Sequence, residues 1–242
     1  MESPADVDFY FDPVCPFAWM ASRWVEEVVS LREYEVDWRF ISLRIVNRDV
    51  DYETRFPAGY EDGHTAGLRM LRVAARTRLE HGPEAVGRLY TELGRRLWDV
   101  EPPADRAAHQ REIGSPASVG AALRAAGLPE DLTAALDDPS WDRTIEDETA
   151  EALSLTGEDV GTPILHFQPP DGLAFFGPVI SRIPRGAEAV ELWDHVVALS
   201  RFSGFAELKR ALRERPRLRV LGGRPDEDGV VEEWYQGSRR RP

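Results

Sequence analysis

Cysteine is nearly absent from this 242-residue chain, and Cys15 is the only one. A lone cysteine excludes an internal disulfide and leaves no set of thiolates for a zinc site. The five histidines include no pair spaced four residues apart, so we expect no metal site. A single unpaired thiol suits a reducing compartment, and we therefore predict a cytoplasmic protein.

Lysine and asparagine are also scarce. Lys209 is the only lysine among 30 basic residues, and Asn47 is the only asparagine. Together with the abundant alanine, glycine and proline, this bias is typical of a GC-rich bacterial genome. It says nothing about the fold.

Long apolar runs are missing as well. No stretch of 18 apolar residues exists, so we predict no membrane-spanning helix, and the N-terminus lacks a basic segment followed by an apolar one. The net charge of −13 would repel a nucleic acid or an anionic membrane, and we expect neither as a partner. Hydrophobic residues make up 42% of the chain, including seven tryptophans and ten phenylalanines, which indicates a globular protein with a real core.

The only cysteine lies where a strand turns into a helix. From Val7 to Phe11 aromatic and aliphatic residues alternate with polar ones, and Asp12 and Pro13 end this strand pattern. Pro16 is suited to the first position of a helix, where a backbone N–H would have no partner. These features predict a strand, a tight turn and a helix that is N-capped by Cys15.

A thiol at a helix N-terminus faces unpaired N–H groups and the positive end of the helix dipole. Both favour the thiolate, so we predict a lowered pKa and a reactive, nucleophilic Cys15. The alternative is a small buried residue that happens to precede a helix, because unpaired cysteine is among the most buried residue types.

The pattern around this turn predicts a βαβ unit. Apolar residues recur at helical spacing from Pro16 to Leu31, and strand alternation returns over residues 34–43. The two strands should be parallel, with Cys15 at their carboxyl ends, where ligands bind in such sheets. Residues 44–63 contain several helix breakers and are predicted to form a long loop that covers the thiol.

The next hundred residues have helical periodicity, and strand patterns return only near the end. Helices are predicted at 64–80, 83–98, 116–126, 130–136 and 140–155, a strand hairpin at 162–167 and 173–176, and helices at 187–200 and 205–212. Residues 214–242 have the composition of a mostly flexible tail.

Three segments resemble the DsbA-like thioredoxin-fold family, and within it the mycothiol-dependent nitroreductases of actinobacteria. They are residues 11–24 (FDPVCPFAWMASRW), 41–47 (ISLRIVN) and 157–186, which contains GTPILHF. The resemblance implies an α/β, thioredoxin-like fold with an all-helical insertion. Its first half would be residues 1–63, the insertion 64–156 and its second half 157–213, followed by the tail.

The resemblance also implies site roles. Cys15 would be the nucleophile, Pro163 a cis-proline beside it, and the backbone of Thr162 would pair with an extended thiol substrate. The other residues expected at the thiol or substrate site are Pro16, Phe17, Ala18, Trp19, Asn47 and Tyr60. Alternatives remain for several of them: an ordinary trans-proline at a strand start, core positions for the two aromatics after Pro16, and a surface cover for Tyr60.

One departure from the family pattern changes the expected chemistry. Dithiol relatives carry CPxC, whereas this chain reads CPFA, with Ala18 in the second position. A single-thiol cycle remains available, in which Cys15 forms a mixed disulfide that a second small thiol resolves. The small thiol would be mycothiol, or alternatively glutathione.

The substrates would be small-molecule or protein mixed disulfides, or electrophiles such as nitroaromatics. Two other functions stay open: an enzyme like the kappa-class glutathione transferases and chromene-carboxylate isomerases, or a thioredoxin-fold scaffold without catalysis. A homodimer is one arrangement that we consider.

Overall fold

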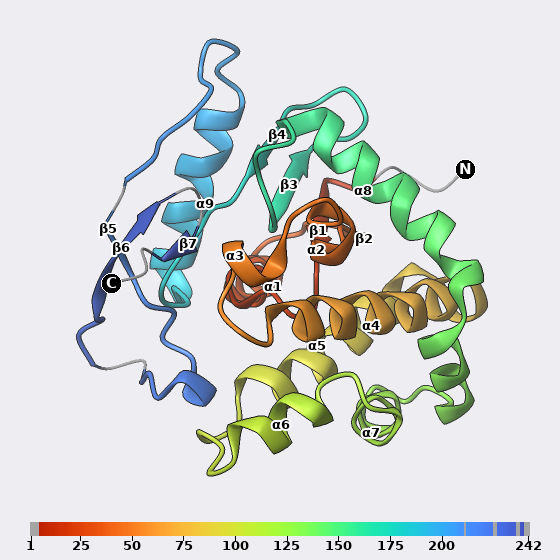
Figure 1. The fold of residues 1–242 in the computed structure, drawn as a ribbon. Coiled ribbons are helices and arrows are strands. Elements are labelled where there is room, and N and C mark those ends of the chain that lie inside the picture. Colours follow the sequence, from red (N-terminus) through yellow and green to blue (C-terminus); the bar gives the residue numbers. More distant parts are fainter. Residues whose placement is uncertain (1–4, 211, 225–226, 236–237, 240–242) are drawn as a thin grey trace.

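A central mixed sheet organises the protein, whose computed structural model describes residues 5–210, 212–224, 227–235 and 238–239. The sheet has the order β2-β1-β3-β4 (Figure 1). β1 and β2 are parallel, as the βαβ pattern predicts, and β3 is antiparallel to both β1 and β4. The strand bounds are β1 (Val7–Phe11), β2 (Val36–Phe40), β3 (Ile164–Phe167) and β4 (Ala174–Phe176).

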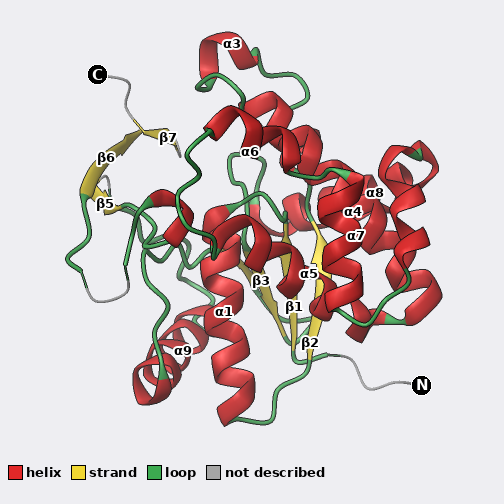
Figure 2. Ribbon diagram, turned by 90° about the horizontal axis from the view of Figure 1, so that it is seen from below, coloured by secondary structure: helices red, strands yellow, loops and turns green. Residues whose placement is uncertain are grey.

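Helices α1 (Pro16–Leu31) and α9 (Gly186–Ser200) pack beside each other against the sheet (Figure 2). Alternation along β1 directs Val7, Phe9 and Phe11 into the main core. The indole of Trp24 joins the two helices, because its Nε1 donates to the Ala189 carbonyl at 2.9 Å.

The segment between β2 and β3 is helical, as predicted. Of the predicted helices, the one over residues 83–98 matches α5 at both ends, and residues 130–137 form a 3-10 helix rather than an α-helix. The elements are α2 (Leu43–Val46), α3 (Tyr52–Arg55), α4 (Tyr60–His81), α5 (Pro83–Trp98), α6 (Arg106–Glu112), α7 (Pro116–Ala125), η1 (Glu130–Asp137), η2 (Pro139–Trp141) and α8 (Asp142–Thr156).

The loop predicted over residues 44–63 is wrong. This stretch contains most of α2, all of α3 and the first turn of α4. The caps explain the short helices: Ser42 Oγ accepts from the N–H of Ile45, and the Asp51 carboxylate accepts from the N–H of Glu53. Helices of four residues are too short to produce a hydrophobic period.

The helix predicted over residues 205–212 is also wrong. Residues 205–210 are not helical, and β5 (Leu212–Glu214) begins where that helix would end. Strand β5 pairs with β6 (Val231–Tyr235), and β6 pairs with β7 (Ser238–Arg239).

The segment predicted as a tail contains buried structure between β5 and β6. A short 3-10 helix, η3 (Arg219–Leu221), follows Leu218, whose side chain is buried in the main core. Residues 225–226, 236–237 and 240–242 of the predicted tail lie outside the described residues.

Across the described residues, no helix combines the length and the apolar character that a membrane span requires.

Glycines on α5 let the insertion approach the aromatic core closely. A Cβ at Gly87 would lie 2.6 Å from Nε1 of Trp38, and one at Gly94 would overlap the Trp19 ring. The ring carbons of both tryptophans are therefore packed against helix backbone. Any added side-chain atom must displace a buried indole.

We expect Gly94→Ala to lower the free energy of unfolding by about 1–3 kcal/mol, because overpacking a filled core forces side chains off their rotamers. Gly120→Ala in α7 is the matched control, since a Cβ there would meet at 3.2 Å only the carboxylate end of Glu130. Helix propensity predicts a gain of up to about 1 kcal/mol for this control. Urea unfolding measures both, and equal effects of the two variants would contradict the packing argument.

Candidate active site

Cys15 caps α1 as the sequence predicts. Its backbone is extended, Pro16 occupies the first helical position, and the N–H of Ala18 points at Sγ with a distance of 3.4 Å. The sulfur therefore lies at the positive end of the helix dipole.

The second component of the site is the segment before β3. Cys15 Sγ donates to the carbonyl oxygen of Thr162 at 3.2 Å, and the Thr162–Pro163 peptide bond is cis, as the resemblance implies. The Thr162 hydroxyl donates to the Tyr10 carbonyl at 3.0 Å and ties this segment to β1. Residues 147 positions apart in the chain are thus brought into direct contact.

The turn that carries the thiol is fixed by the insertion. The indole Nε1 of Trp98, at the end of α5, donates to the Pro13 carbonyl at 3.2 Å. On α4, Gly67 lies so close that a Cβ there would be 2.8 Å from a methyl group of Val14. Two insertion helices therefore hold the backbone between β1 and α1.

Asp12 anchors the same turn from inside. It is fully buried, and its two carboxylate oxygens accept from the N–H groups of Val14 at 3.1 Å and Leu43 at 2.8 Å. The second bond connects the end of β1 to the start of α2. The sequence pattern marked Asp12 only as the residue that ends a strand, although an acid three positions before a cysteine is visible in the sequence.

The predicted lowered pKa of Cys15 is wrong for this conformation. Burial raises the pKa of the thiol to about 12; the N–H groups of Ala18 and Phe17 act in the opposite direction, and the Asp12 charge adds to the increase. A charge at a helix terminus is stabilised by at most about 2 kcal/mol. Removing a charge from water costs several kcal/mol, so burial outweighs the helix terminus.

The thiol is consequently neutral at pH 7, and it donates the hydrogen bond to the Thr162 carbonyl. Only 6% of Cys15 is exposed. Each pH unit below a pKa corresponds to about 1.4 kcal/mol, so forming the thiolate here at pH 7 costs on the order of 7 kcal/mol.

The residues that follow Pro16 belong largely to the core. Ala18 and Trp19 are fully buried and Phe17 is 9% exposed. The guanidinium carbon of Arg23 lies 4.2 Å from the centre of the Trp19 ring. Trp19 thus follows the core alternative and does not form a wall that a substrate could reach.

Asn47 and Tyr60 lie at helix ends rather than in a long loop. Asn47 is the C-cap of α2, and its Nδ2 donates to the Leu43 carbonyl at 2.8 Å. Tyr60 begins α4, is 43% exposed and stacks on Phe56 with ring centres 5.5 Å apart.

An aromatic cluster accompanies Tyr60, and the sequence pattern did not single out its other members. The Tyr52 hydroxyl lies 2.9 Å from Nδ1 of His64, and both rings contact Phe56. Burial, aided by the Arg44 charge, lowers the pKa of His64 to about 4, so this imidazole is neutral at pH 7. His64 lies about one helical turn before Gly67, and Gly67 packs against Val14. The cluster is therefore next to the turn that carries Cys15.

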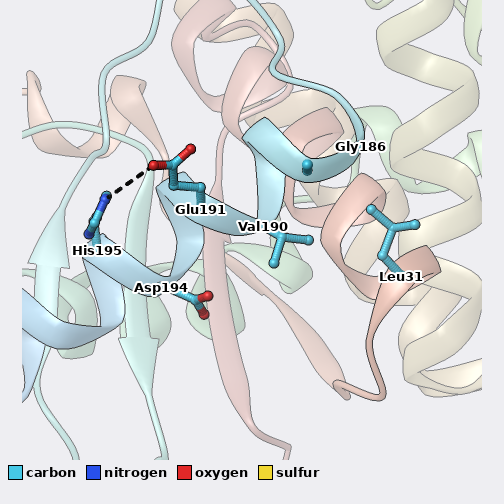
Figure 3. Close-up of a pocket in the computed structure, with 7 residues that line it drawn as sticks. Leu31, Gly186, Val190, Glu191, Asp194 and His195 are labelled. Carbon is cyan, nitrogen blue, oxygen red and sulfur yellow. Dashed lines mark ion pairs between the residues drawn. The ribbon is translucent and has the colours of Figure 1, made fainter.

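Among the described residues, no three histidine, cysteine or acidic side chains are grouped as metal ligands. A surface hollow lies between the last turn of α1 and α9 (Figure 3), far from the thiol. The 16 residues of α1 separate Leu31, which lines the hollow, from Cys15 by about 24 Å. The hollow is therefore not part of the candidate active site.

The sheet order, the helical insertion and the cysteine facing a cis-proline define a DsbA-like protein of the thioredoxin fold. A probable DsbA oxidoreductase from Streptomyces coelicolor has a similar fold, with a TM-score of 0.50 and 15% identity, covering 88% of this chain and 97% of that one. The cytosolic disulfide reductase DsbM from Pseudomonas aeruginosa matches with a TM-score of 0.44 and 16% identity, over 69% of this chain and 86% of that one.

The family follows from the sequence comparison. Residues 14–210 match the Rv2466c-like family, described as mycothiol-dependent nitroreductase Rv2466c, and the chain belongs to this family. It is also 29% identical to the uncharacterized protein Rv2286c of Mycobacterium tuberculosis over 204 residues, which span 84% of this chain and 81% of that protein. The fold and the family that the motifs predicted are thus confirmed.

We expect iodoacetamide to alkylate native Cys15 at pH 7.5 at least about 100-fold more slowly than the urea-unfolded chain. An unfolded cysteine titrates near pH 8.5, and the raised pKa of the folded thiol leaves far less thiolate. Mass spectrometry at timed intervals measures both rates. Equal rates would contradict the burial of the sulfur.

Proposed function

We propose that this protein is a thiol-dependent oxidoreductase that works through Cys15 alone. The observation that carries the proposal is the position of Cys15 Sγ, 3.4 Å from a helix N-terminal N–H and 3.2 Å from the carbonyl before a cis-proline. Membership of a mycothiol-dependent nitroreductase family supports it.

The chemistry is a two-step exchange. The Cys15 thiolate attacks one sulfur of a disulfide, which forms a mixed disulfide with the protein and releases the other half as a thiolate that takes up a proton. A small thiol then loses its proton and attacks the substrate sulfur of the mixed disulfide, so that it leaves joined to the substrate half in a new disulfide and Cys15 is released as the thiolate. The N–H of Ala18 is positioned to stabilise negative charge on Sγ in both steps.

Ala18 determines that the second thiol must come from outside. A CPxC protein resolves the mixed disulfide with its own second cysteine, and here that position is a fully buried alanine. We infer that mycothiol serves as the resolving thiol, with glutathione as the alternative. The compartment would be the cytoplasm, where such thiols are kept reduced.

Mixed disulfides are the substrate class that this cycle handles directly, including those on other proteins. Reduction of a nitroaromatic needs two electrons per step, which two thiols supply as they join in one disulfide. Both substrate classes use the same Cys15 sulfur.

The burial of Cys15 requires a change when a partner binds. A cost on the order of 7 kcal/mol corresponds to a factor of about 10⁵ in the thiolate population at pH 7. The incoming thiol compound must therefore bring polar groups to the sulfur, or expose it, before exchange proceeds at a useful rate.

That same burial favours a second candidate function, a thioredoxin-fold scaffold without catalysis. A cysteine that is 6% exposed and neutral resembles an ordinary core residue. An enzyme like the kappa-class transferases would bind the small thiol without a covalent bond to the protein. Covalent adduct formation separates the first proposal from both.

Incubation with oxidised mycothiol or oxidised glutathione should add the mass of one thiol to the native protein, with the modification on Cys15. The larger yield is expected with mycothiol, and reduced thiol should reverse the adduct. Cys15→Ser is the control and should gain no mass. An unmodified native protein would contradict the proposed cycle and favour the second candidate function, a scaffold without catalysis.

Ala18→Cys should create an internal disulfide with Cys15, because residues three apart on a first helical turn face each other. Oxidation should remove both titratable thiols and lower the mass by two hydrogens. Ala21→Cys is a matched control, equally buried on α1 but nearly two turns from Cys15. Thiols in Ala18→Cys that resist oxidation would count against the turn geometry.

A further inference from the structure

Asp12 is a buried acid that no cation in the described part of the chain balances. It is 0% exposed, and within that part the hydrogen bonds to its carboxylate come from the two backbone N–H groups of Val14 and Leu43. No arginine, lysine or histidine from the described residues acts on its charge. Burial of an unbalanced carboxylate favours its protonated form.

Asp12 and Cys15 lie in the same four-residue turn. Asp12 is three residues before Cys15, the Cys15 N–H donates to the Asp12 carbonyl at 3.0 Å, and a charge on Asp12 disfavours a charge on Cys15. The contact of Gly67 with Asp12 excludes water from this side, because no room is left there even for a Cβ. Two like charges in such a site repel strongly.

We propose that Asp12 tunes the ionisation of Cys15: a charge on Asp12 makes the thiolate of the buried sulfur about tenfold rarer than it is in molecules whose Asp12 is protonated. Asp12 is then a positioning residue with two effects. Its hydrogen bonds hold the turn that carries Cys15, and its charge disfavours a charge on Sγ. The role of Asp12 in thiol–disulfide exchange rests on the proposed function of Cys15.

The surrounding groups leave Asp12 as the one that titrates near neutrality. Burial raises the pKa of Asp12 to about 7, and the two backbone N–H groups lower it only in part. Tyr90 of α5 faces both partners, and burial keeps its hydroxyl protonated throughout the range that matters. Tyr52 of α3 faces Asp12, and burial raises the pKa of its hydroxyl as well.

The remaining neighbours keep a constant charge. His64 of α4 has a pKa lowered to about 4 by burial and is neutral above pH 5. Burial lowers the pKa of Arg23 of α1. The charge of Arg23 acts on Tyr90 but not on Cys15. Arg44 of α2 acts on His64 and Tyr52.

Coupling of this kind has a signature in the pH profile of thiol reactivity. Well below the pKa of a thiol, the thiolate population rises tenfold per pH unit. Where Asp12 ionises, the growing repulsion offsets part of each gain of thiolate, and for a tenfold coupling the slope of the logarithmic profile falls to about one half over roughly one pH unit. Above that interval the full slope resumes.

The experiment measures the alkylation rate of Cys15 by iodoacetamide, an uncharged reagent, from pH 5 to pH 10 in the native protein. For the natural sequence we expect a logarithmic profile whose slope falls to about one half over roughly one pH unit, beginning near pH 7. For Asp12→Asn we expect a straight line that coincides with the natural protein below pH 6 and lies about tenfold above it beyond pH 9.

Asp8→Asn is the matched control, because Asp8 in β1 is another buried acid, with a pKa that burial raises to about 6, and its charge does not act on Cys15. This variant should keep the segment of reduced slope. Parallel profiles for Asp12→Asn and the natural protein, together with a loss of thermal stability, would overturn the proposal and leave Asp12 as a structural acceptor.

The natural protein decides the matter even if Asp12→Asn fails to fold, since a straight profile without a segment of reduced slope also overturns the proposal. The assay contains no small thiol or disulfide. It can therefore fail while the exchange reaction of Cys15 stands, and it can succeed in a protein that forms no mixed disulfide.

Discussion

The burial of the Asp12–Cys15 turn is the constraint on which the rest of the structure depends. This four-residue turn ends the first strand and starts the first helix, so its backbone polar groups must all find partners away from water. Asp12 supplies acceptors for Val14 and Leu43, and Trp98 supplies a donor for Pro13. The last two contacts come from beyond β2, so parts of the chain distant in sequence hold the turn in its folded shape.

Two electrostatic effects oppose each other at the sulfur. The helix N-terminus favours a thiolate, whereas burial and the Asp12 charge favour the thiol, and in this conformation burial dominates. The same features that hold the thiol in place therefore also keep it unreactive. A thiol that ionises only when a partner alters its surroundings is protected against adventitious oxidation, since susceptibility follows thiolate character and exposure.

Local chemistry could be predicted from the sequence. The alternation from Val7 to Phe11, Pro16 after Cys15 and the apolar stripe of α1 all depend on neighbours within a few residues. Helix α5 was bounded correctly by Pro83 and Trp98 for the same reason. The motif around Thr162 pointed to the correct family, and through the family to the cis bond that faces the thiol.

Properties that arise from packing could not be predicted in this way. The pKa of Cys15 depends on the helices that exclude water from it, and the acid at position 12 gains its importance from Gly67, which follows it by 55 positions. Helices α2 and α3 have four residues each, too few for a period, and are defined by the caps Ser42 and Asp51. Leu218 lies in a polar segment, yet its side chain fills the core.

The most direct test of the single-thiol account is the exchange equilibrium of the native protein in buffers of graded oxidised and reduced small thiol. A lone cysteine predicts that the ratio of mixed-disulfide to reduced protein is proportional to the first power of the oxidised-to-reduced thiol ratio, and that it returns to zero when reduced thiol is in excess. Folded protein that carries no mixed disulfide at any ratio would contradict the account.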